Sequence, residues 1–136
     1  LMASQHPTLK NLSFQELPRM QHDQVARALQ DALLFLSCGH PEGFGLPLAE
    51  AIACGCLVVG YHGLAGRDFA LPHMHVVEFG DLLGLLQGIK SELARFDAAP
   101  EAVIQERLAA SESILQCYSL EAERDCCLRT WAQICP

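Results

Sequence analysis

Basic residues are scarce in this chain of 136 residues. It has 9 Lys and Arg against 16 Asp and Glu, so its formal net charge is −7 at pH 7. Proteins that bind nucleic acid gain affinity when Lys and Arg release counterions from phosphates, so this balance argues against DNA or RNA as a partner. It leaves room for a small anionic ligand, because such a ligand responds to local backbone donors more than to net charge.

Long hydrophobic runs are missing as well. No apolar run reaches the ~18 residues that a helix needs to span a bilayer, and the N-terminus, which reads LMASQHP, has no signal-peptide pattern. We therefore expect a cytoplasmic protein without a transmembrane segment. Because the chain does not begin with Met, we also expect it to be part of a longer protein.

Metal-ligand spacings are absent too. The seven cysteines contain no CxxC pair, and neither the Cys-x-Cys at 54–56 nor the adjacent pair at 126–127 has zinc spacing. His73 and His75 are expected to share a strand face, but they lack a third ligand. We predict no metal site and reduced thiols that act as small hydrophobic side chains. The cysteines are Cys38, Cys54, Cys56, Cys117, Cys126, Cys127 and Cys135.

Apolar residues are plentiful, at 51% of the chain against 18% charged residues, which is typical of a globular domain with a real core. Helical spacing of apolar residues predicts a helix from about His22. The apolar run Leu33–Leu36 predicts a strand buried on both faces, and Leu57–Val59 and Val76–Val77 predict two more. Pro47–Cys54 predicts a short helix between them. The alternation predicts an α/β fold, a small parallel sheet flanked by helices.

The last third of the chain is expected to be helical. Asp81 is expected to cap a helix that runs to about Arg95, and Ser119 to cap the last helix. Two apolar stripes are expected to face the core, with Trp131 a core residue. They consist of Ile104, Leu108, Ser111 and Leu115, and of Leu120, Cys127, Trp131 and Ile134. We therefore predict a single domain over residues 1–136, with an arm at 1–11, αβ units at 12–80 and helices at 81–136.

Three or four strands make a small sheet for so many helices. Doubly wound nucleotide-binding domains have about six strands, so the chain resembles the C-terminal half of a Rossmann-like domain. The edge of its first strand then needs cover from a missing segment or from another chain. We expect self-association through this exposed edge.

The segment His40–Gly60 reads HPEGFGLPLAEAIACGCLVVG and carries the chemistry. It follows a buried strand and opens a helix, so its loop lies at the carboxyl end of a parallel strand, where open α/β sheets bind ligands. Gly43 and Gly45 let the backbone approach a ligand closely. The amides of Gly45, Leu46 and Leu48 are expected to point out of the helix N-terminus, which favours a phosphate or the hydroxyls of an attached sugar.

Two carboxylates flank this loop. Glu42 precedes the glycines, and Glu50 sits one turn into the helix on the side that faces away from Leu48. Because a carboxylate accepts two hydrogen bonds at once, Glu50 suits the vicinal hydroxyls of a ribose. Glu42 is expected to reach the group beyond the phosphates.

Glu42 and Glu50, with seven residues between them that include GFGLP and with AxxxG following, resemble the E-x7-E motif of glycosyltransferase family 4. The resemblance is clearest over about residues 14–69. It implies the GT-B fold, in which two Rossmann-like domains face each other across a cleft. It also implies transfer of a sugar from a nucleotide diphosphate donor with retention of anomeric configuration, and no metal requirement.

The same resemblance assigns the site residues. Glu42 is the expected catalytic residue, in contact with the donor sugar and stabilising an oxocarbenium-like transition state. The expected substrate-binding residues bind the sugar and the diphosphate through backbone amides, and Glu50 binds the ribose. They are Gly43, Phe44, Gly45, Leu46 and Glu50.

The sequence departs from the family in two places. Asp68, in the loop HGLAGRDF, stands where the family has a Glu, and its role stays open. The chain also lacks the basic pair that binds the diphosphate, the acceptor site and a catalytic His, which in the family lie upstream. We therefore expect the isolated chain to be inactive and its main partner to be the missing N-terminal domain of the same protein.

Two other functions remain possible. One is a free-standing module that binds a nucleotide sugar or another protein without transferring anything. The other is a flavodoxin-like regulator, which would need an acidic cluster after its first strand, and this sequence has none.

Overall fold

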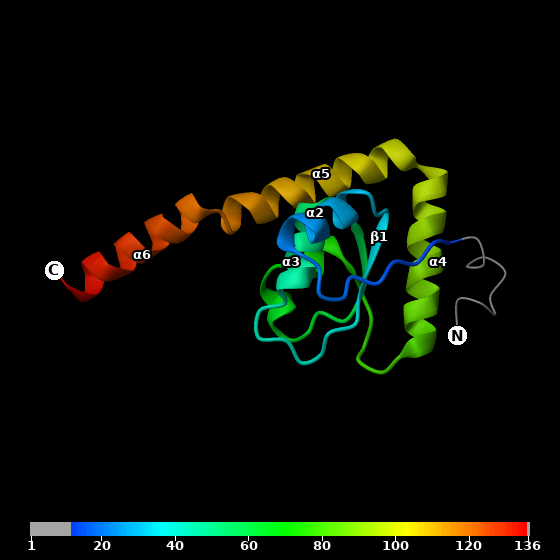
Figure 1. Ribbon diagram of the computed structural model, residues 1–136, viewed down its shortest axis with the longest axis horizontal. Coiled ribbons are helices and arrows are strands. Elements are labelled where there is room, and N and C mark those ends of the chain that lie inside the picture. Colours follow the sequence, from blue (N-terminus) through cyan, green and yellow to red (C-terminus); the bar gives the residue numbers. More distant parts are fainter. Residues whose placement is uncertain (1–11, 136) are drawn as a thin grey trace.

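Strands and helices alternate through the first part of the chain, and helices alone make up its last part. The computed structural model describes residues 12–135, so the arm expected at residues 1–11 lies outside it. The elements, in chain order, are α2 (His22–Gln30), β1 (Leu34–Ser37), α3 (Leu46–Ala53), β2 (Leu57–Gly60), the 3-10 turns η2 (Ala65–Asp68) and η3 (Leu71–His73), β3 (His75–Val76), α4 (Leu82–Ala98), α5 (Pro100–Cys117) and α6 (Leu120–Ile134) (Figure 1).

The three strands form one parallel sheet in the order β1-β2-β3. Leu34 lies opposite Leu57 at the start of the first pair, and Ser37 lies opposite Gly60 at its end. Val59 lies opposite His75 in the second pair. Because all strands run the same way, their carboxyl ends and the loops that follow them meet at one edge. The predicted α/β class with a small parallel sheet is confirmed.

Both faces of the sheet are covered by helices. Val58 packs into a cluster with residues of α2, α3 and α5, whereas Val59 packs with Ile89 of α4 on the other face. Figure 1 shows α4 on one side of the sheet and α2, α3 and α5 on the other. Every residue of β2 is buried, as a continuous apolar run predicts for a central parallel strand.

The two predicted helix N-caps are confirmed, whereas α4 ends at Ala98 and not at about Arg95 as expected. The carboxylate of Asp81 accepts a hydrogen bond from the amide of Gly84 at 2.8 Å, at the start of α4. The hydroxyl of Ser119 accepts one from the amide of Ala122 at 3.1 Å, at the start of α6. Each satisfies an amide that a helix N-terminus leaves without a partner.

The stripe predicted for α5 is wrong by one residue. Ile104, Leu108 and Leu115 are 41%, 52% and 57% exposed. The buried positions are Val103, Ala110 and Ile114. One residue on a helix is a rotation of about 100°, so the buried side is turned by that angle from the predicted one.

The stripe predicted for α6 is wrong as well. None of its residues is buried, and Trp131, which we expected in the core, is 63% exposed. In Figure 1, α6 continues outward from the end of α5, away from the sheet. The expected spacing is present, but the described part of the chain supplies no surface for this helix to pack against.

β1 and β3 are the outer strands of the sheet. Among residues 12–135, β1 pairs with β2 alone. A cavity of about 490 Å³ lies beside β1, lined by that strand and by residues that include Phe14 and Leu17. Self-association through the edge at β1 stays a prediction.

The prediction that the cysteines act as small hydrophobic side chains holds only for Cys54 and Cys56, which are at least partly buried. All seven are free thiols, but Cys38, Cys117, Cys126, Cys127 and Cys135 are exposed. Cys56 is buried, and its thiol donates to the carbonyl of Leu29 at 3.1 Å. Burial, helped by the nearby Cys54, raises the pKa of Cys56 to about 11, so it stays a thiol at neutral pH.

Residues 12–135 contain neither a membrane-spanning helix nor a cluster of metal-binding side chains. No helix in this part of the chain is both long and apolar enough to cross a membrane. No group of three or more His, Cys, Asp or Glu side chains within the same residues is placed to hold a metal ion. His73 ends η3 whereas His75 lies in β3, so the two do not share a strand face as expected.

Candidate functional site

Three loops meet at the carboxyl edge of the sheet. The amide of Glu42, in the loop after β1, donates to the carbonyl of Gly63, in the loop after β2, at 2.8 Å. The ring of His40 stacks on Phe79, in the loop after β3, with 4.3 Å between ring centres. The position predicted for the GFGLP loop is therefore the position that the structure gives it.

Glu42 is exposed and is held by its backbone, through a short parallel bridge with Leu64. Its side chain runs past Gly63, where a Cβ atom would lie 2.8 Å from the Cβ of Glu42. Gly63 also has a φ of 65°, a left-handed conformation that favours glycine. A cavity of about 80 Å³ beside Glu42 is lined by Phe35, Ser37, Cys38, Gly39, Glu42, Gly45, Pro47, Leu48, Tyr61, His62 and Gly63.

The start of α3 leaves a run of backbone amides without acceptors. Gly45 is the N-cap residue, with a φ of 85°, and its carbonyl accepts from the amides of Leu48 at 3.0 Å and Ala49 at 3.1 Å. Leu48 was expected to offer its amide to a ligand, and this prediction is wrong because the first turn of the helix uses that amide. The amides of residues 43–46 donate to no acceptor within residues 12–135.

The side chain of Phe44 anchors this loop. Its ring stacks on Phe69, with 5.0 Å between centres, and meets the edge of Tyr118 at 5.3 Å. Such aromatic pairs contribute on the order of 0.5–1.5 kcal/mol beyond their buried area. The contacts of the Phe44 ring with Phe69 and Tyr118 therefore fix the backbone of the loop.

Glu50 lies apart from the cavity beside Glu42. Its side chain is 33% exposed and faces α2, with Oε1 3.6 Å from Nδ1 of His22. An exposed contact at this distance contributes little, so His22 leaves the carboxylate able to bind a ligand. Glu42 thus lies in the loop before α3, and Glu50 lies on the side of α3 that faces α2. The free amides lie between them, at the start of the helix.

The loop after β2 holds site residues that the motif did not indicate. Tyr61, His62 and Gly63 line the cavity beside Glu42. Leu64 has φ 82° and ψ −65°, a rare conformation for a side chain of this size, and its amide donates to Nδ1 of His62 at 3.1 Å. Strain of this kind costs on the order of 1–3 kcal/mol and gathers at functional sites. A signal that could have indicated this loop is its position directly after β2, the strand that lies beside β1 in the sheet.

Asp68 closes η2 and is exposed, as is the neighbouring Arg67. Neither residue lines the cavity beside Glu42. The open role of Asp68 therefore receives no support from its position.

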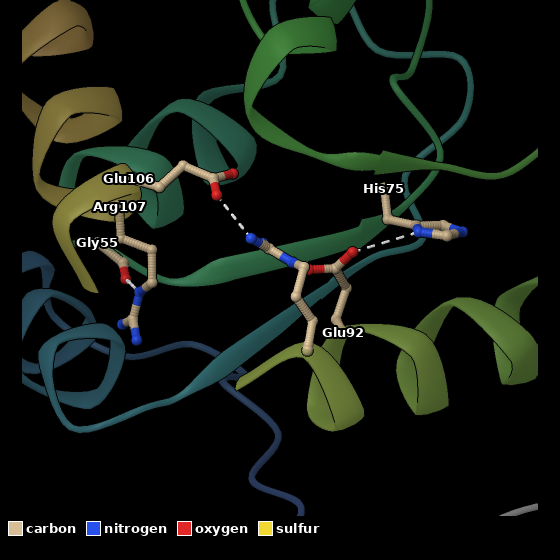
Figure 2. A network of polar contacts seen from close by, with 6 residues as sticks. Gly55, His75, Glu92, Glu106 and Arg107 are labelled. Carbon is tan, nitrogen blue, oxygen red and sulfur yellow. Dashed lines mark hydrogen bonds and ion pairs between the residues drawn. The ribbon is translucent and has the colours of Figure 1, made fainter. Parts of the chain in front are cut away.

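Side chains of α5 hold the far end of α3. Nε of Arg107 donates to the carbonyl of Gly55 (Figure 2). The hydroxyl of Ser111 donates to the carbonyl of Ala53 at 2.5 Å. Burial lowers the pKa of the Arg107 guanidinium, but an arginine still carries its charge at neutral pH. A cation here complements the negative end of the α3 dipole.

A second polar cluster lies at the amino edge of the sheet, away from the loops. Arg95 donates to Glu92 at 2.8 Å and to Glu106 at 2.6 Å. These hydrogen bonds raise the pKa of the guanidinium, and the bond to Glu92 has the largest effect. Nδ1 of His75 lies 3.4 Å from Oε1 of Glu92 (Figure 2). A cavity of about 350 Å³ is lined by these side chains and by Arg107.

A parallel sheet covered on both faces, with its functional loops at the carboxyl edge, defines an α/β half-domain of the Rossmann-like kind. The chain belongs to the family described as Glycosyl transferases group 1, whose model matches residues 2–69. The matched region contains Glu42, Glu50 and the free amides between them.

A curated relative agrees with this family. The chain is 32% identical over 53 residues to an alpha-1,6-glucosyltransferase of Actinobacillus pleuropneumoniae serotype 7 (strain AP76). The shared stretch covers 39% of this chain and 16% of the relative, so the chain corresponds to a small part of that enzyme's length. No solved structure matches the chain.

Proposed function

We propose that this chain is the donor-binding part of a retaining glycosyltransferase that uses a nucleotide diphosphate sugar. The observation that carries the proposal is the run of amides at residues 43–46, which have no acceptor among residues 12–135 and which follow Glu42 directly in the same loop. Backbone amides at a helix N-terminus are suited to bind a diphosphate. They also stabilise the negative charge that develops on a departing nucleoside diphosphate.

The two glutamates take different roles in this proposal. Glu42 interacts with the sugar, where positive charge develops at the anomeric carbon as the bond to the diphosphate breaks. Glu50, on the α2 side of α3, accepts hydrogen bonds from the ribose hydroxyls. The amides supply the positive field between them, so the proposed reaction requires no divalent metal ion.

The sugar is proposed to be a hexose. The relative in Actinobacillus pleuropneumoniae is named as a glucosyltransferase, which favours a glucose-like donor. The acceptor site and the rest of the cleft are proposed to come from other segments of a longer protein. Without them water reaches the reacting atoms, so we expect the isolated chain to transfer no sugar.

The test is a comparison of two substitutions in the complete transferase. Glu50→Ala is expected to weaken binding of the free nucleoside diphosphate by about tenfold, or on the order of 1.5 kcal/mol, because Glu50 is partly exposed. Glu42→Gln is expected to lower kcat and leave the affinity for the nucleoside diphosphate unchanged, since the effect arises in the transition state. Calorimetric titration and steady-state kinetics measure the two effects.

Glu112→Gln, an exposed glutamate on α5, is the matched control and is expected to change neither quantity. Equal losses of nucleotide affinity in Glu50→Ala and Glu42→Gln would contradict the separate roles. Unchanged affinity and kcat in both variants would contradict the site itself.

A further inference from the structure

Three aromatic side chains gather at the carboxyl edge, one from the loop after each strand. The ring of Phe79 stacks on His40, with 4.3 Å between centres and 23° between planes. Tyr61 meets the same phenyl ring edge-on at 5.4 Å. The two contacts fix the orientation of the phenyl ring, because offset stacking and edge contacts are the arrangements that aromatic rings prefer.

The ring of Phe79 is held in place and still faces solvent. Tyr61 is buried, with 7% of its surface exposed, whereas Phe79 is 63% exposed. A single exposed phenylalanine is ordinary on a protein surface. This one differs because two other rings hold it beside the site. Tyr61 also lines the cavity that contains Glu42, so the aromatic group borders that cavity directly.

An exposed aromatic ring whose partner Tyr61 lines the same cavity as Glu42 suits a sugar ring. The C–H bonds on one face of a pyranose pack against an aromatic ring, while its hydroxyls donate to carboxylate oxygens. A nucleobase also stacks on aromatic rings, but the position of the two glutamates favours the sugar. His40 lies two residues from Glu42 in the same loop, whereas Glu50, the proposed ribose partner, lies outside this cavity.

We propose that Phe79, backed by His40 and Tyr61, is the surface on which the transferred pyranose stacks. The inference rests on the proposed function, because the pyranose that stacks here is the sugar of the proposed nucleotide diphosphate donor. It makes Phe79 a residue that selects donors whose sugar presents a C–H face, in addition to the residues of the E-x7-E motif.

The test is saturation-transfer NMR on the 136-residue chain with UDP-glucose, ADP-glucose and GDP-mannose. Ribose and hexose protons are read in the same spectrum, so the nucleotide serves as an internal control. With the donor that gives the strongest ribose signals, Phe79→Ala is expected to weaken the affinity by about 2- to 10-fold. The hexose signals are expected to fall while the relative strength of the ribose signals is kept.

Phe79→Trp keeps an aromatic face and is expected to restore the hexose signals. Phe14→Ala removes another exposed phenylalanine, beside β1, and is expected to change nothing. Hexose signals that persist in Phe79→Ala, or that fall equally with the ribose signals, would overturn the stacking role and leave the proposed function standing. Absence of ribose signals with all three donors on the unaltered chain would overturn the proposed function, and the stacking role with it.

Discussion

Glu42 depends for its position on a neighbour without a side chain. Its amide bonds to the carbonyl of Gly63, and its own side chain passes where a Cβ of Gly63 would stand. The left-handed φ of 65° at Gly63 adds a second reason for glycine there. Gly43 has neither constraint, because a Cβ built on it meets no atom within 4 Å. The structure therefore constrains Gly63, whereas Gly43 has open space beside it, where we propose that the ligand approaches.

Substitution of these glycines tests this difference. Gly63→Ala is expected to lower the free energy of unfolding by about 1–2 kcal/mol, because alanine is strained at positive φ and displaces Glu42. Gly43→Ala is expected to leave stability within about 0.5 kcal/mol and to weaken donor binding, because its methyl group stands where the ligand approaches. Urea unfolding with a donor titration measures both. Equal stability of the two variants would contradict this assignment.

At the scale of residues, the motif and its loop were predictable, but the surroundings were not. Glu42 and the glycines stand out from the spacing E-x7-E and from their position after a buried strand. Leu64 carries no local signal, since nothing in its identity predicts a φ of 82°. The stacking of Phe79 on His40 joins residues that are 39 positions apart in the sequence. Such a contact depends on how the three loops fold together.

Among the elements, α3 is a short helix whose two ends differ in their hydrogen bonds. Its N-terminal amides are free for a ligand, while its C-terminal carbonyls and the turn after it bind Arg107 and Ser111 of α5. Eight residues form a marginal helix alone, so packing and these bonds determine its orientation. Because α3 carries the proposed diphosphate site, the hydrogen bonds from α5 also position that site.

Removal of the α5 contacts is expected to loosen α3. Arg107→Met keeps the apolar stem and removes the donor, so we expect a loss of about 1.5 kcal/mol in the free energy of unfolding, and Ser111→Ala a loss of about 1 kcal/mol. Arg129→Met, on the exposed side of α6, is the matched control and is expected to change stability by less than about 0.5 kcal/mol. Denaturant unfolding measures all three. If Arg107→Met were as stable as the control, α5 would not secure α3.

The orientation of α5 shows where helix patterns mislead. The sequence offers two stripes that differ by one position, and the one that contains Leu108 is the more apolar. The buried stripe contains Val103 and Ala110 instead, and Arg107, between them on the same side of the helix, donates to the carbonyl of Gly55. Strand and helix limits near the motif were predictable within one or two residues, since continuous apolar runs and capping residues define them locally.

At the scale of the whole molecule, the chain is a half-domain with one functional end. Its sheet has β1 as an outer strand, and its last helix extends outward with Trp131 exposed (Figure 1). The loops after all three strands meet at the carboxyl edge, whereas the cavity lined by Arg95 and Arg107 lies at the amino edge. Glu92 and Glu106 also line that cavity and pair with Arg95, so we propose that the nucleotide diphosphate binds at the carboxyl edge instead.

Backbone amide NMR of the isotope-labelled chain, titrated with uridine, adenosine and guanosine diphosphates, tests this assignment most directly. We predict that one of the nucleotides shifts the amides of residues 43–46 and of the loop 61–64, because the diphosphate binds the free amides at the start of α3. Amides of α6 and of Arg107 are predicted to stay where they are. Shifts confined to residues around Arg95 and Arg107, with residues 43–46 unchanged, would contradict the account.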